Sequence, residues 1–401
     1  MRCTLPVIRV MLCVAGLALG HVSTAQTESD ERALLDVKNG ISISKEPKFL
    51  LNLRFRMQAR LGLNTVGGED LSTDKVEGRI RRLRLRFDGH VLNRKVQYYI
   101  QLAFSKADMD LESGEIAQPI RDAILYYNFS PNFYMGFGQS KLPGNRERVV
   151  SSGNLQFADR SIANGAFTLD RDFGVFGYWT IPAGGTLFNV KGAVTTGDGR
   201  NASAINSGMD YTGRLEFLPF GKFEGSGDYS EGDLEREMTP KLSIAAGYSF
   251  NDDAVRTGGQ LGSDLYAPRD MGTFIADLMF KWKGVGAMFE VFDRRTSDPF
   301  TFDADGAQRI ALEGTAMNSQ LSYCWPKHWE LAGRYAFVQP STRLRSSVKK
   351  SEEAILGLTK YLNGHRIKAH LNVGYRWTEG DAALDHPGNS WNAMVQVEFG
   401  I

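Results

Sequence analysis

Long hydrophobic runs are scarce in this chain of 401 residues, and so is cysteine. Beyond residue 25, no apolar run approaches the roughly 18 residues that a membrane helix needs. Two of the 3 cysteines, Cys3 and Cys13, lie before that point, so only Cys324 remains and no intrachain disulfide is expected. Leu12 and further apolar residues flank Cys13, which argues against a lipid-attachment site. These absences exclude a helical membrane protein and a disulfide-stapled domain.

An excess of charge of either sign is also missing. The sequence has 47 basic and 46 acidic residues, a net charge of +1. Removal of the first 25 residues takes away Arg2 and Arg9 and no acidic residue, which brings the net charge to about −1. A nucleic-acid-binding protein would need a basic excess, so no nucleic-acid partner is expected.

Motifs for catalysis and for metal binding are lacking too. Neither Gly-x-Ser-x-Gly nor His-Glu-x-x-His occurs, although a site assembled across strands would leave no linear motif. Asp108, Asp110 and Glu112 have the alternate spacing of calcium ligands. The glycine is displaced from the EF-hand pattern, so a solvated acidic loop is the favoured interpretation. We therefore expect no enzyme activity, no metal and no cofactor.

The first 25 residues have the layout of a secretory signal peptide. Arg2 and Arg9 supply the basic start, residues 10–19 the apolar stretch, and Ser23-Thr24-Ala25 the small residues before the cut. Residues 26–47 are expected to form a periplasmic lead-in. Weak apolar spacing around Leu34 suggests a helical turn or two there, with disorder as the alternative.

From Phe49 onward the sequence alternates between apolar and polar residues. Residues 49–63 keep this period of two throughout, which is much longer than an ordinary strand of about 5–6 residues. Such a length suits a tilted membrane strand, which needs at least about 9–11 residues. The pattern is weakest near residue 310, where Glu313 and Ser319 blur it. The recurring alternation predicts sixteen strands, which begin near residues 49, 80, 95, 120, 133, 173, 186, 209, 241, 271, 285, 310, 328, 352, 365 and 390.

The links between these strands differ in length according to parity. Links after even-numbered strands are short, such as Asn93-Arg94, whereas links after odd-numbered strands are long and polar, such as residues 64–78. Short turns on one side and long loops on the other are typical of outer-membrane barrels, whose short side is periplasmic. One even link, residues 220–239, breaks the rule. The expected fold is all-β: a transmembrane antiparallel β-barrel over residues 48–401, with outer-membrane lipid around it.

Aromatic residues gather at the predicted strand ends. Rings favour the headgroup level of a membrane, so two belts are expected of a barrel. The turn-side set is Phe129, Phe133, Trp179, Trp282, Trp329 and Phe399, and the loop-side set is Tyr211, Phe337, Tyr375 and Trp391.

One stretch carries a resemblance to a known family. From Gly138 the sequence reads GQSKLPGNRERVVSSGNLQFADRS and later RDFGV, which resembles the phosphate-selective porin O/P family. Residues 219–241, which end in LEREMTPKL, are also similar to a segment of that family. The resemblance implies a sixteen-stranded homotrimeric porin with a long loop, about residues 141–172, folded into its lumen. The matching positions are Gly138, Gln139, Lys141, Pro143, Glu147, Phe157, Arg160, Ser161, Gly174 and Val175.

Arginine is concentrated on the polar face of the first two predicted strands. If these strands pair symmetrically around their loop, the arginines form one basic wall of the lumen, offset only by Asp88. Arginine binds phosphate and carboxylate bidentately, and walls of arginine occur in anion pores. The alternative is an ordinary polar lumen or a structural patch paired with loop carboxylates. The predicted basic wall consists of Arg54, Arg56, Arg60, Arg82, Arg84 and Arg86.

The expected constriction loop is nearly neutral, which indicates a size filter more than an anion trap. Its charged residues are Lys141, Arg146, Glu147, Arg148, Asp159, Arg160, Asp170, Arg171 and Asp172. Asp277 and Glu290 fall on strands opposite the basic wall and predict a transverse field, although Lys241 and Lys281 dilute it.

The favoured function is a passive diffusion channel for small hydrophilic solutes, with a mild preference for anions and phosphate as a candidate. The alternative is a barrel that acts mainly as a surface docking protein through its long loops. A lumen blocked by residues 141–172 would favour docking, whereas an open eyelet of arginines would favour conduction.

Overall fold

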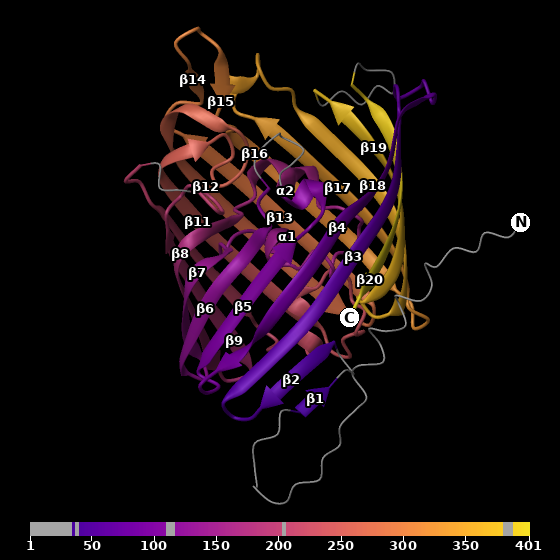
Figure 1. The fold of residues 1–401 in the computed structure, drawn as a ribbon. Helices are drawn as coiled ribbons and strands as arrows, with labels where there is room; N and C mark the ends of the chain where they lie inside the picture. Colours follow the sequence, from indigo (N-terminus) through magenta and orange to yellow (C-terminus); the bar gives the residue numbers. More distant parts are fainter. Residues whose placement is uncertain (1–33, 37–39, 110–116, 203–205, 380–387) are drawn as a thin grey trace, which may run out of the picture. The chain divides into compact units, whose positions relative to one another are not determined.

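Sixteen antiparallel strands close into a barrel in the computed structural model of the protein (Figure 1). The structure describes residues 34–36, 40–109, 117–202, 206–379 and 388–401, so the expected signal peptide lies outside the described residues. In that described part, no helix is both long enough and apolar enough to cross a membrane. The barrel strands are β3 (Phe49–Thr65), β4 (Thr73–Val91), β5 (Val96–Ala103), β6 (Ile120–Ser130), β7 (Phe133–Lys141), β8 (Arg171–Ala183), β9 (Thr186–Thr195), β10 (Asp210–Leu218), β11 (Lys241–Arg256), β12 (Asp264–Trp282), β13 (Val285–Thr296), β16 (Gly314–Cys324), β17 (Trp329–Pro340), β18 (Ser351–Asn363), β19 (Ile367–Thr378) and β20 (Ser390–Gly400).

The barrel closes between its first and last strands. β3 pairs with β20 from Asn64 opposite Asn392 to Arg56 opposite Gly400. The predicted fold class is confirmed, and most strands begin within a few residues of the predicted positions. β4 and β12 begin earlier, at Thr73 and Asp264, because their backbone pairing with β3 and β11 continues into the external side.

Two short strands before the barrel extend its edge on the turn side. β2 (Ile41–Lys45) pairs with residues 49–53 of β3, directly beyond the part of β3 that β20 covers. β1 (Leu34–Asp36) pairs with β2, so the helical turn expected around Leu34 is wrong. The open edge of β2 offers backbone partners to β1, and this pairing overrides the weak helical spacing.

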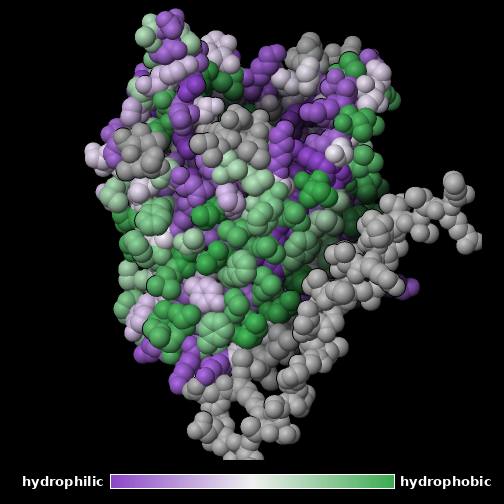
Figure 2. All heavy atoms as spheres, in the orientation of Figure 1, coloured by the Kyte–Doolittle hydropathy of each residue, from purple (hydrophilic) through white to green (hydrophobic). Residues whose placement is uncertain are grey.

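The outward faces of the strands are apolar, as the alternation predicts. Leu371, Val395 and Leu61 lie in one row across β19, β20 and β3, and each is more than two-fifths exposed. Figure 2 shows apolar residues in a band across the visible wall, with hydrophilic residues at the loop rim. Of the predicted belt residues, Tyr375 departs from expectation, because Trp377 and Trp391 pack against its ring at 4.8 Å and leave it 4% exposed.

Two long connections fold into the lumen instead of projecting from it. Residues 142–170 join β7 to β8 and contain α1 (Arg146–Val149) and α2 (Ile162–Phe167), which lie inside the barrel in Figure 1. Residues 219–240 join β10 to β11 and contain η3 (Glu224–Tyr229). The two insertions touch, because the Glu231 amide donates to the Asn154 carbonyl at 2.9 Å.

The remaining small elements belong to external loops. η1 (Lys106–Met109) follows β5, β14 (Phe300–Phe302) pairs with β15 (Gln308–Ile310) at the loop rim, and η4 (Thr342–Leu344) follows β17. Of these elements, only η1 contributes to the site described next.

Candidate functional site

Three neighbouring cavities lie between the loop of residues 142–170 and the inner wall, the upper one against β3, β4 and β17–β20 and the other two mainly against β3–β8. The upper cavity, on the loop side, measures about 450 Å³, the eyelet cavity about 180 Å³, and the lower cavity, on the turn side, about 390 Å³. The upper and eyelet cavities share the lining residues Arg81, Arg82, Arg148 and Arg160. The eyelet and lower cavities share Arg84, Lys141 and Arg171. We call this connected series the basic path.

Cations dominate the eyelet cavity, which has the smallest volume of the three. Asp108 and Asp170 are the acidic residues that line the eyelet cavity. Its basic lining residues are Arg81, Arg82, Arg84, Arg121, Lys141, Arg148, Arg160, Arg171 and Arg200.

Some of these cations have carboxylate partners. Asp108, on η1, accepts two hydrogen bonds from Arg84, at 2.7 and 2.9 Å. Asp170 accepts from Arg148 at 2.8 Å and from Arg171 at 3.2 Å. Burial would raise the pKa of the Asp170 carboxyl, but the Arg148 and Arg171 guanidinium groups hold it well below its ordinary value. These carboxylates therefore remain charged and fix the arginines in place.

Within the described part of the chain, three other eyelet cations hydrogen-bond to backbone carbonyl groups alone. Lys141 donates to the carbonyls of residues 148–150, at 2.8 to 3.4 Å. Arg160 donates to the Glu147 and Val150 carbonyls, and Arg121 donates to the Asp108 carbonyl. Carbonyl oxygens satisfy N–H donors but carry no net charge, so positive charge remains uncompensated in the eyelet. Burial, and the nearby Arg148, lower the pKa of Arg160 to about 10, which still leaves it protonated at neutral pH.

Two β-bulges bring arginines into the eyelet that strict alternation does not predict. The β3–β4 register passes from Gln58 opposite Arg82 to Ala59 opposite Ile80, so Arg81 is an extra residue. The β5–β6 register likewise skips Arg121. A bulge breaks the period of two and re-aims a side chain, and in both cases the extra arginine lines the eyelet cavity.

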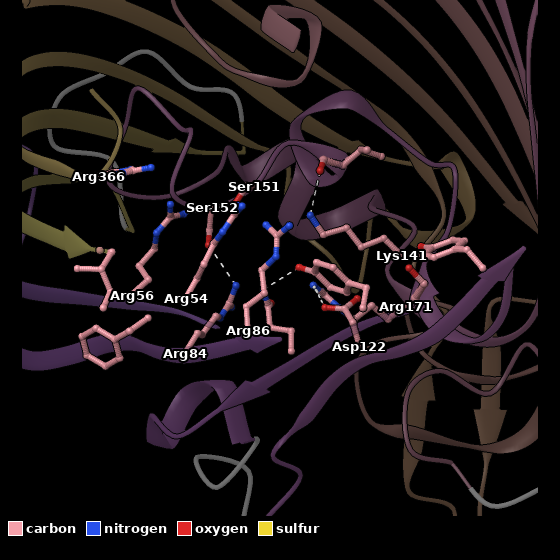
Figure 3. A pocket seen from close by; sticks show the side chains of 18 of the residues that line it. Arg54, Arg56, Arg84, Arg86, Asp122, Lys141, Ser151, Ser152, Arg171 and Arg366 are labelled. Carbon is pink, nitrogen blue, oxygen red and sulfur yellow. Dashed lines mark hydrogen bonds and ion pairs between the residues drawn. The ribbon is translucent and has the colours of Figure 1, made fainter. Parts of the chain in front are cut away.

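The six predicted basic-wall arginines lie on the inner face of β3 and β4 but divide among different environments. Arg54 stands opposite Arg86, and Arg56 stands opposite Arg84. These four line the lower cavity (Figure 3), and Arg86 pairs with Asp88 at 2.7 Å. Arg82 bonds to Gln58 at 2.8 Å, and Arg60 bonds to Asp159 at 2.5 Å and to Gln396.

Asp159 is the loop residue that meets this wall. It lies within 3.6 Å of Arg81 and 3.3 Å of Arg82, in addition to its bond to Arg60. Burial alone would raise the pKa of its carboxyl, but the three guanidinium groups lower the pKa below its ordinary value. The loop is thus held against β3 and β4 by a permanently charged group.

The opposite end of the loop is anchored by the predicted acidic residues. Arg146 donates to Asp277 at 2.7 Å and to the Ser243 hydroxyl at 2.9 Å. The Glu147 amide donates to Glu290 at 2.8 Å. Asp277 and Glu290 are 4% and 0% exposed, so they lie behind the loop and not along an open surface.

Residues 219–240 fill the remaining part of the lumen, beside β9–β13. We call this filled region, together with the strands β9–β13, the packed half. The Asp228 carbonyl accepts from Arg146 at 2.9 Å, and Tyr229 donates to Glu216 at 2.7 Å. Lys191 pairs with Glu216 at 2.8 Å, and Arg214 pairs with Asp277 at 2.6 Å. The basic path and the packed half therefore share the cross-section of the barrel.

The residues behind the sequence resemblance brace the loop internally. Lys141 and Arg160 bond to carbonyls around α1, and Glu147 accepts from the Ser161 amide and hydroxyl at 2.8 and 2.6 Å. Ser161 also caps α2 through the Asn164 amide. At Gly138 the backbone has φ +135°, and an added Cβ would lie 2.3 Å from the Ala123 carbonyl. The motif therefore specifies the shape of the loop.

Of the three acidic residues with the spacing of calcium ligands, the structure describes Asp108, and it binds an arginine. Asp108 is bound to Arg84, and Asp110 and Glu112 lie outside the described residues. Across the residues that the structure describes, no group of three or more His, Cys, Asp or Glu side chains is placed to hold a metal ion.

Solved structures with a similar fold include an outer-membrane protein and an outer-membrane channel. OmpT of Vibrio cholerae, in its trimer form, superposes with a TM-score of 0.54 at 13% identity, over 88% of this chain and 100% of that one. The channel DcaP of Acinetobacter baumannii gives 0.52 at 13% identity, over 90% and 100%. OmpF of Salmonella typhi gives 0.51 at 14% identity, over 88% and 98%.

Curated proteins give only partial matches. The cysteine desulfurase IscS of Anaeromyxobacter sp. (strain Fw109-5) is 31% identical over 154 residues, or 37% of this chain. The chain spans only about 38% of the length of that enzyme. Because the described residues build one barrel, this local similarity carries no activity over to the chain.

The family comparison covers the region that contains the eyelet. The model of the phosphate-selective porin O and P family matches residues 51–263, just over half of the chain, from β3 to the end of the loop after β11. Together with the barrel fold, this match shows that the chain belongs to the phosphate-selective porin O and P family and forms an outer-membrane diffusion channel.

Proposed function

We propose that this porin favours anions, inorganic phosphate among them, and that the eyelet cavity sets the preference. The observation that carries the proposal is the excess of cations over carboxylates in the eyelet lining. Rings of Arg and Lys are the usual lining of anion pores, and the arginine guanidinium matches phosphate oxygens bidentately.

The shared lining residues support a stepwise passage. An anion that enters the upper cavity meets Arg82 and Arg160, which also line the eyelet, and then Lys141, which also lines the lower cavity. Because neighbouring cavities share cations, a passing anion stays close to at least one cation as it moves from one cavity to the next. The row of neighbouring cavities that share cationic lining residues supports conduction over the alternative of surface docking.

The proposed export and assembly follow from the sequence and the fold. Residues 1–25 serve as a cleaved signal peptide, residues 26–47 as a periplasmic lead-in, and residues 141–172 as the constriction loop. The OmpT structure in trimer form supports a homotrimer for this chain as well. Small polar solutes and outer-membrane lipid are the expected partners.

A reversal-potential measurement in a salt gradient across a planar bilayer tests the preference. We expect wild-type channels to favour chloride over potassium, and inorganic phosphate to reduce the chloride current. The double variant Arg121→Gln/Arg160→Gln removes two uncompensated eyelet cations and is expected to shift the reversal potential toward cation preference.

The matched control is Arg295→Gln/Arg345→Gln, which removes the same charge from exposed positions away from the eyelet. An unchanged reversal potential in the eyelet variant would contradict the proposal. An equal shift in the control would attribute the preference to overall charge instead of the eyelet.

A further inference from the structure

The lower cavity has two chemically different sides. One side is basic and consists of Arg54, Arg56, Arg84, Arg86 and Arg366, whose labelled side chains gather around one space in Figure 3. The other side carries the rings of Tyr99, Tyr126 and Tyr178, from β5, β6 and β8, beside Lys141 and the paired Asp122 and Arg171. An oxyanion needs the first side only, so the tyrosines require a separate explanation.

The volume of the lower cavity also exceeds what a small oxyanion needs. The cavity measures about 390 Å³, within the range of about 300–1,000 Å³ that is typical of sites for small organic molecules. A water molecule takes up about 30 Å³ of liquid, and a phosphate ion is only a few times larger. Most of the cavity therefore remains for a larger ligand.

Two of the arginines are available to hold an anionic group. In the described part of the chain, Arg54 has no hydrogen-bond or salt-bridge partner, and the hydrogen bond of Arg56 is a long one of 3.3 Å to Ser151. They are two residues apart on β3, so both point inward from the same strand. Arg84 and Arg86, by contrast, are already paired with Asp108 and Asp88.

The tyrosine side is firmly built. Tyr126 and Tyr178 meet edge to face at 6.4 Å, Tyr134 stacks on Tyr178 at 4.6 Å, and Arg86 lies over Tyr99 at 4.8 Å. At Gly136 an added Cβ would come within 2.8 Å of the Tyr126 ring, so the glycine leaves room for that ring against the strand. Rings held in this way lose little conformational entropy when a ligand stacks on them.

We infer that the lower cavity binds a ring-bearing organic phosphate. Arg54 and Arg56 hold the phosphate of the monoester, and its flat ring stacks on the tyrosine side. Gln101 lines the same cavity, and its side-chain oxygen, which has no hydrogen-bond partner among the described residues, can accept from a polar group on the ring. This inference rests on the proposed anion preference and names the solute class that uses it.

The test compares two phosphate monoesters of equal charge, phenyl phosphate and methyl phosphate, as blockers of chloride current in planar bilayers. We expect phenyl phosphate to block the wild-type channel at about tenfold lower concentration, an effect of the size that one ring-stacking contact supports. Equal blocking by the two esters in the wild type would overturn the inference, whatever the variants do.

Variants assign the effect to the cavity. In Tyr126→Leu, phenyl phosphate and methyl phosphate are expected to block at similar concentrations. Tyr126→Phe, which keeps the ring, is expected to retain the tenfold difference. Tyr127→Leu is the matched control, because Tyr127 is the next residue on β6 but faces outward and is 45% exposed. Arg54→Gln/Arg56→Gln is expected to weaken both blockers equally and leave their ratio unchanged.

The outcome is separable from that of the proposed function. Loss of anion preference in the salt gradient, with the tenfold ratio intact, would reject the eyelet proposal and keep the lower-cavity site. Anion preference with a ratio near one would do the reverse. If Tyr126→Leu fails to fold, the wild-type ratio and the Tyr126→Phe variant still decide the inference.

Discussion

The basic path and the packed half contain similar charged residues but arrange them differently. In the packed half, Arg146 and Arg214 share Asp277, and Lys191 pairs with Glu216, whereas Arg294 bonds to a hydroxyl and to carbonyl oxygens. In the basic path, the hydrogen bonds from Arg121 and Arg160 to the described residues go to carbonyl oxygens. The central cations of the packed half are therefore paired with carboxylates, whereas these two eyelet cations are not.

The physical consequence concerns water. A charge withdrawn from water without a partner is costly, and the carboxylates of Asp277 and Glu216 lower that cost for Arg146, Arg214 and Lys191. The basic path keeps cavities on both sides of the eyelet, and water or a passing anion can solvate its cations there. Ion pairs thus help to hold residues 142–170 and 219–240 in position. The eyelet cations that bond only to carbonyl groups of the described residues lie where a solute would pass.

Breaking the central pair of the packed half is expected to have the largest effect. Asp277→Ala leaves Arg146 and Arg214 buried without their shared carboxylate, which is expected to cost about 3–5 kcal/mol of folding stability. Urea refolding followed by heat-modifiable gel mobility measures this loss. Asp293→Ala is the control, because the exposed Asp293–Arg295 pair is expected to contribute less than about 1 kcal/mol. Equal losses would show that the packed half is not specially dependent on pairing.

The outer wall gives the next largest effect. Val395→Arg places a charge in the lipid-facing row and is expected to cost about 2–4 kcal/mol if that row lies near the bilayer midplane. Asn392→Arg, on the same strand but lining the upper cavity, is expected to cost little. Refolding into lipid vesicles compares the two, and similar losses would contradict the assignment of faces.

A buried acid in the packed half predicts a dependence on pH. Burial, and the neighbouring Glu147, raise the pKa of Glu231 from 4.5 to about 8. Between these values the folded chain keeps a proton that the unfolded chain has released, so stability is expected to fall as pH rises from about 4.5 to 8. Above pH 8 this contribution levels off.

The backbone amide of Gln156 donates to Glu231 at 3.0 Å. Glu231→Gln keeps an oxygen that can accept this hydrogen bond, but the new side chain cannot ionise. The midpoint of urea unfolding is therefore expected to fall less between pH 6 and pH 9 in this variant than in the wild type. Parallel pH profiles would show that Glu231 does not retain its proton in the folded chain.

The smallest effect is expected from the solitary arginine of the basic path. Arg54→Gln removes no hydrogen bond or salt bridge to a described residue, so folding stability is expected to change by less than about 0.5 kcal/mol. The reversal potential is expected to shift slightly toward cations at low salt. In 1 M salt, where the Debye length is about 3 Å, the shift is expected to vanish. A shift that survives at 1 M would indicate a structural change in the path instead of a loss of charge.

The strand number, the closure and the faces of the barrel were evident in the sequence because they follow from local rules. Side chains alternate with a period of two, and a sheet within lipid must close so that every backbone group is paired. The apolar face of β3, and the alternation of short and long links between strands, could therefore be predicted from the sequence alone. The family motif likewise placed a constriction loop within residues 141–172, and its charged residues there brace α1 and α2.

The composition of the eyelet, by contrast, was decided by the tertiary structure. Each bulge adds one residue and shifts the alternation without a local signature, so Arg81 and Arg121 were missed. The choice of partners was also invisible, because Arg146 and Asp277 are 131 residues apart and only the folded loop brings them together. Periodicity determines which face of a strand a residue occupies, whereas pairing across the lumen determines whether its charge is neutralised or left for a solute.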